Sequence, residues 1–161
     1  MSQDAPRTLA DYGQDLTAAV EVAFPAWMLR RVVALRPDLE AAAVAAAATA
    51  TADLVTNLRE LLAADVDEQR STPMQLVRRA TAAATGLLAD AATPPVHRDP
   101  WSVEADPEDR YDLRIASWEE LGPEVADAGL VWGAAKAHAH LRRRADRGVQ
   151  PPEPGVPPLQ P

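Results

Sequence analysis

Apolar side chains recur at steps of three and four residues along most of the chain, which is the spacing of one face of an α-helix. This pattern predicts helices over residues 8–23, 37–64, 73–91 and 130–146. Proline lacks a backbone N–H and crowds the preceding turn, so Pro25 marks either a kink or the start of a separate helix that contains Trp27. We therefore expect an all-α fold, a single-domain bundle of four to five helices without a sheet.

Turn signals divide the region before the final helix. Ser117 followed by Glu120 is a capping-box pattern, which predicts a short helix over residues 118–121. Pro123 can start another turn, and we expect Gly129 to end it. The row of the final helix that we expect to face the bundle contains Leu130, Val131, Ala134, Ala137, His138 and Leu141.

Residues 93–116 interrupt the helical pattern. Three Pro-Pro or Asp-Pro pairs exclude a continuous helix, and we find no alternating strand pattern in their place. The segment nevertheless contains apolar and aromatic residues, which disordered linkers lack. We expect an ordered, irregular loop laid over the bundle and held by burial of Trp101 and Tyr111. Ordered loops of this length are often functional.

Composition favours a protein of the bacterial cytoplasm. Cysteine is absent, which excludes disulfides and thiolate chemistry. A formal net charge of −8 makes binding to nucleic acid unfavourable. The first seven residues lack the basic and apolar regions of a signal peptide. The apolar run over residues 40–53 is too short to span a membrane, so we expect no membrane segment.

No pattern in the sequence supports catalysis or metal binding. His138 and His140 are two residues apart, so on a helix they point in different directions and cannot ligate one metal ion together. None of the serines lies in a nucleophile elbow, and the glycines are too scattered for a phosphate-binding loop. We predict no catalytic residue, no metal site and no cofactor.

Aromatic residues are concentrated near the loop. Trp101, Tyr111, Trp118 and Trp132 all lie within one stretch of 32 residues. Such residues clamp a loop onto helices by burial, or they anchor a partner, since tryptophan and tyrosine are frequent interface hot spots. Trp132 lies off the expected inward row of its helix, which favours the second role for that residue.

Two stretches resemble a family of small actinobacterial proteins known only as hypothetical proteins. The first, residues 58–80, reads LRELLAADVDEQRSTPMQLVRRA. The second, residues 94–141, contains PPVHRDPW and YDLRIASWEELGPEVADAGLVWGAAKAHAHL. The resemblance covers about half of the chain. It implies a bacterial cytoplasmic setting and brings no known activity or site residue.

These observations favour a non-enzymatic protein-interaction or regulatory protein. Its working surface would be the loop over residues 98–111 with the final helix, and its partner another protein; a homodimer is left open. The alternative is a small-molecule-binding or enzymatic domain, whose pocket beneath the 93–116 loop accepts an anionic ligand. The candidate binding residues are Arg98, Trp101, Tyr111, Trp132 and Lys136.

We divide the chain into a helical domain, residues 1–147, and a disordered proline-rich tail, residues 148–161. The tail offers almost no apolar surface to bury. A chain that ends at Gly148 should therefore melt within about one or two degrees of the full chain, as expected for removal of an unpacked terminus. Calorimetry of both forms tests this, and a clearly larger fall in melting temperature would show that the tail is packed.

Overall fold

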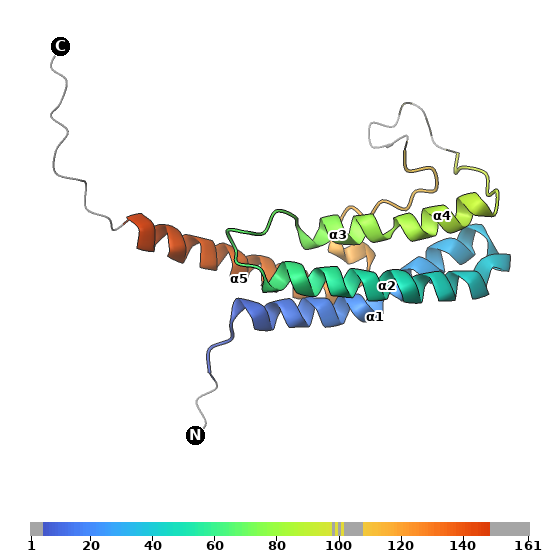
Figure 1. The fold of residues 1–161 in the computed structure, drawn as a ribbon. Coiled ribbons are helices and arrows are strands. Elements are labelled where there is room, and N and C mark those ends of the chain that lie inside the picture. Colours follow the sequence, from blue (N-terminus) through green and yellow to red (C-terminus); the bar gives the residue numbers. More distant parts are fainter. Residues whose placement is uncertain (1–4, 98, 100, 102–107, 149–161) are drawn as a thin grey trace, which may run out of the picture.

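The computed structural model describes residues 5–97, 99, 101 and 108–148, and the predicted tail beyond Gly148 lies outside this part. Over the described residues the fold is all-helical, without a strand, which confirms the predicted fold class (Figure 1). Five α-helices and two short 3₁₀ helices follow one another: α1 (Leu9–Leu35), η1 (Pro37–Leu39), α2 (Glu40–Ala63), α3 (Pro73–Ala80), α4 (Ala82–Asp90), η2 (Trp118–Glu120) and α5 (Pro123–Gly148).

Helix α1 is continuous through Pro25, so the proline does not divide the segment into two helices. The helix begins at a capping box, in which the Thr8 hydroxyl accepts the Asp11 N–H and the Asp11 carboxylate accepts the Thr8 N–H. An interior proline costs about 3 kcal/mol. The fully or almost fully buried side chains around it are Phe24, Trp27 and Met28. Burial of these large residues offsets the cost of the proline.

The helix predicted over residues 73–91 is two helices. A second capping box, between Thr72 and Gln75, starts α3 with Pro73 in its first turn, as the sequence predicts. At Thr81 the hydroxyl donates to the Arg78 carbonyl over 2.7 Å, and the backbone tightens into a short turn before α4. Side-chain bonds of this kind compete with the helical ladder and can bend a helix.

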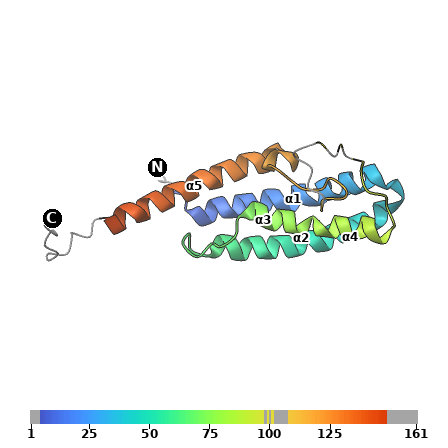
Figure 2. The same cartoon turned by 90° about the horizontal axis from the view of Figure 1, so that it is seen from above.

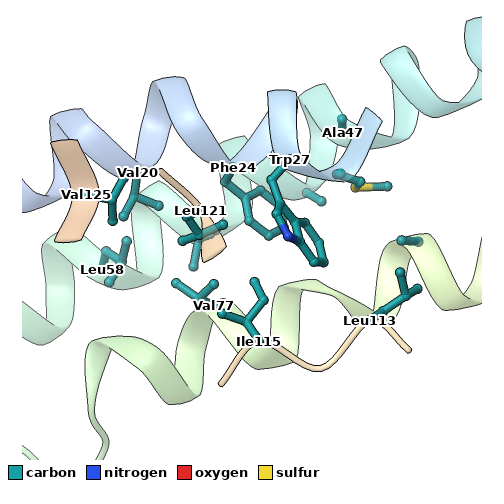
Figure 3. Close-up of a cluster of buried hydrophobic side chains, with 14 of the residues drawn as sticks. Val20, Phe24, Trp27, Ala47, Leu58, Val77, Leu113, Ile115, Leu121 and Val125 are labelled. Atoms are coloured by element: carbon teal, nitrogen blue, oxygen red, sulfur yellow. The ribbon is translucent and has the colours of Figure 1, made fainter. Parts of the chain in front are cut away.

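Helix α1 is the central helix of the bundle. It packs against α2 on one side and α5 on another, while α3 and α4 cover α2 (Figure 2). The segment after Tyr111 closes the remaining side, and Figure 3 shows side chains from α1, α2, α3, α5 and this segment in one core. The labelled members are Val20, Phe24, Trp27, Ala47, Leu58, Val77, Leu113, Ile115, Leu121 and Val125.

By length and composition alone, Pro37–Ala63 is apolar enough to cross a membrane. A core helix of a bundle has the same properties, and in this structure α2 lies between α1 and the α3–α4 pair. This finding is weak evidence for a membrane span. The absence of a membrane segment stays a prediction from the sequence.

The structure corrects the expected boundary at Gly129. This residue does not end a turn: it is buried inside the uninterrupted helix α5. A Cβ atom added there would lie 2.7 Å from Cδ1 of Trp118, which is closer than packed atoms approach. Glycine is therefore required for the contact between η2 and α5, and not for a helix end.

Gly129→Ala should destabilise the protein by about 1–3 kcal/mol, because the Trp118 ring must move to admit the methyl group. Gly86→Ala in α4 is the matched control, since no atom lies within 4 Å of its added Cβ. The control should stabilise by about 0.5–1 kcal/mol, the helix-propensity gain of alanine over glycine. Denaturant unfolding measures the free energy of unfolding of both variants. A stabilising effect of Gly129→Ala would show that the Trp118 ring does not approach Gly129 this closely.

Candidate interaction surface

Helix α5 carries a row of exposed apolar side chains along one side. Leu130 is 71% exposed, Leu141 64% and Val131 48%, although large apolar residues elsewhere on the helix are buried. We call this side the outer face of α5. It consists of Asp127, Leu130, Val131, Ala134, Ala137, His138, Leu141 and Arg144, all exposed.

The sequence prediction for this helix was wrong about which side faces the bundle. The side that packs on α1 carries Val125, Gly129 and Trp132 instead of the leucine row. Val125 is fully buried, and Trp132 covers more apolar area than a leucine does. His138, expected in the core, is exposed with the rest of the outer face. Counting apolar residues favoured the wrong side, because the true contact uses one tryptophan and small residues.

The carboxyl-terminal end of α5 is tied to the connection between α2 and α3. Arg143 forms ion pairs with Asp65 and, over 3.2 Å, with Asp67, and Arg147 also pairs with Asp67. Partial burial alone would raise the pKa of Asp67, but hydrogen bonds and charge from the two arginines outweigh it and lower this pKa. Arg142 and Arg144 form no ion pair within the described part of the chain.

The last part of α5 extends beyond the end of the bundle formed by the other helices (Figures 1 and 2). Almost all residues of α5 after Leu141 are exposed. Helical segments without tertiary packing are marginal in water, because most helix stability in proteins comes from a packed face. The end of α5 is therefore held by the ion pairs of Arg143 and Arg147 with little burial of its side chains.

Trp132 and Lys136, two of the predicted binding residues, lie together on the inner side of α5. The Lys136 ammonium is 5.0 Å from the centre of the Trp132 ring, within cation–π distance. Partial burial lowers the pKa of Lys136. Trp132 is 8% exposed, and its indole Nε1 has no hydrogen-bond partner among the described residues. The tryptophan mainly joins α5 to the core.

Tyr111 anchors the segment that follows the loop. Its hydroxyl donates to the Thr93 carbonyl over 2.9 Å, and its ring is buried. Side chains then alternate between buried and exposed through residue 116. This is the pattern of an extended chain, so the sequence does contain the alternating signal that we missed. The prediction that Tyr111 holds an ordered segment is consistent with this arrangement.

Among the described residues the extended segment has no neighbouring strand, so its carbonyl groups need other donors. Arg31 of α1 donates to the Asp112 carbonyl over 2.9 Å. Arg78 of α3 donates from Nε to the Ile115 carbonyl over 2.7 Å and from Nη2 to that of Ala116 over 3.2 Å. Two arginines thus take the place of a sheet partner.

The structure contradicts the expected burial of Trp101, which is 88% exposed. Its backbone N–H donates to the Asp99 carboxylate, and no cavity among those found contains its ring. Arg98 lies outside the described residues. The candidate residues therefore do not form one site. Trp132 and Lys136 are in contact on α5. Tyr111 is buried near the end of α4, and Trp101 is exposed to solvent.

The cavities found in the described part of the chain lie away from these residues. One of about 600 Å³ lies between α1 and α2, and one of about 530 Å³ lies between α2 and the α3–α4 pair. Both are open grooves lined mainly by alanine, threonine and other small residues. Among described side chains, no three histidine or acidic groups are placed to hold a metal ion.

Comparisons with known proteins give no further guide. The chain matches no protein-family model, no curated protein and no solved structure.

Trp101→Ala should change the free energy of unfolding by no more than about 0.5 kcal/mol, as is usual for an exposed position. Tyr111→Phe should cost about 1–2 kcal/mol, because it leaves the Thr93 carbonyl without the tyrosine hydroxyl. Denaturant unfolding of the two variants separates these cases. A large loss for Trp101→Ala would instead restore the expectation that this ring is packed.

Proposed function

We propose that this chain is a non-enzymatic protein-interaction protein whose working surface is the outer face of α5. The observation that supports this most directly is the exposed row of Leu130, Val131 and Leu141 on a helix whose opposite side packs on α1. Monomeric proteins rarely leave contiguous apolar surface uncovered, and such surface commonly marks an interaction site. Trp101 adds a second exposed apolar anchor on the loop, consistent with the frequent use of tryptophan at interfaces.

The competing hypothesis, an anion-binding pocket beneath the loop, has less support. Of its expected lining residues, Tyr111 uses its hydroxyl in an internal hydrogen bond and Trp132 packs into the core. We also propose a bacterial cytoplasmic setting, supported by the absence of cysteine and by the high alanine and arginine content.

A photo-crosslinking amino acid at Leu130 or Leu141 tests the proposed surface in native cells. We expect covalent adducts with protein from both positions, and Asp at the other leucine should weaken them because it places a charge in the contact. Val22 of α1 is the matched control, since it is also apolar and 71% exposed but lies on a different helix. Equal adducts from Val22, or none from the leucines, would contradict the proposal.

A further inference from the structure

The outer face of α5 has an internal regularity that suggests its partner. Six of its positions are separated alternately by three and four residues, which is the a and d spacing of a coiled-coil seam. In chain order they are Asp127, Leu130, Ala134, Ala137, Leu141 and Arg144. All six are exposed, while the opposite side of the helix packs on α1. The row therefore has the spacing of a coiled-coil seam, and its residues are exposed in a single copy of the chain.

The residues at these six positions are complementary about the centre of the row. From the first end they are an acid, a leucine and an alanine; from the other they are a base, a leucine and an alanine. We propose that two copies of this chain associate through their α5 helices, antiparallel and around a two-fold axis. Leu130 then faces Leu141 of the second copy, and Ala134 faces Ala137. Asp127 faces Arg144 at both ends of the seam.

Charge selects the antiparallel arrangement. The acids of α5 near the seam, Glu124 and Asp127, lie in its first turns, whereas Arg142 and Arg144 lie near its end. Antiparallel pairing places each acidic end beside a basic end. Parallel pairing would place acid beside acid and base beside base, which is unfavourable. Neither Asp127 nor Arg144 has an ion-pair partner within the described chain, so both are free to pair across the axis.

The size of the side chains agrees with this arrangement. Ala134 and Ala137 lie at the centre of the seam, where small residues let two helix backbones approach closely. The seam from Asp127 to Arg144 is about 25 Å long at 1.5 Å per residue. Pairing would also give the extended end of α5 the packed face that it lacks in one copy. A closed two-fold contact uses the same surface on both copies and stops at a dimer.

The absence of cysteine permits a direct test, because one introduced cysteine can form a disulfide only with another copy. Two variants of the full chain, Asp127→Cys and Arg144→Cys, are purified, one with a size tag, then mixed and mildly oxidised. In the proposed dimer the two cysteines face each other, so the mixed disulfide should form about tenfold or more faster than either self-disulfide, as expected for a high effective concentration. Both sites are exposed, so folding should be unaffected.

Two controls identify the contact. Val22→Cys on α1, at a site with 71% exposure, reports random collision. Leu130→Asp added to both variants should return the mixed disulfide to that collision level, because it buries a charge opposite Leu141. Rapid self-disulfides of Asp127→Cys would show parallel pairing and overturn the proposal. So would equal rates for all three cysteine positions.

This inference rests on the proposed function, since it names the partner of the same surface. Different experimental results contradict the proposed surface and the proposed partner. If the photo-crosslinker at Leu130 joins a different protein while the cysteine pair shows only collision, the outer face of α5 is an interaction surface but its partner is not a second copy. If neither experiment shows a contact, both proposals are wrong.

Discussion

The fold depends on the burial of α1, which is apolar around too much of its circumference to be covered by one neighbour. Its buried residues include Leu16, Val20, Phe24 and Val32, which are separated by multiples of four and so shift around the helix by about 40° per step of four. Helix α2 covers one side and α5 another. Burial of apolar area is the main favourable term in folding. The other elements therefore pack where they cover the apolar sides of α1.

The remaining side of α1 is covered by an extended segment where a regular bundle would have a helix. An extended chain can place every second side chain in the core, as Tyr111, Leu113 and Ile115 do. Its cost is a row of backbone groups with no strand beside them. Arg31 and Arg78 supply donors to these carbonyls, and the Asp109 carboxylate accepts the N–H groups of Leu113 and Arg114. The arginines are therefore part of the architecture as well as charges at the surface.

Helix α5 combines two roles through its two sides. The inner side is short of large aliphatic residues and uses Val125, the Gly129–Trp118 contact and Trp132 to join the core. The outer side keeps its leucines in solvent and its end extends past the bundle. The exposed row of α5 contains more large aliphatic residues than the packed side. Exposing these residues does not stabilise a single copy of the chain. This imbalance is the physical reason for assigning the protein's interactions to α5.

Local signals in the sequence determined much of this structure. Helical periodicity and proline positions were enough for the all-α class and for most helix boundaries, because they act within a few residues. The continuity of α1 through Pro25 and the outward side of α5 were decided by tertiary packing. The last of these could not be read from periodicity. Gly129 lies on the inner side against the ring of Trp118, eleven residues earlier in the chain, and only the folded chain shows that the ring needs this space.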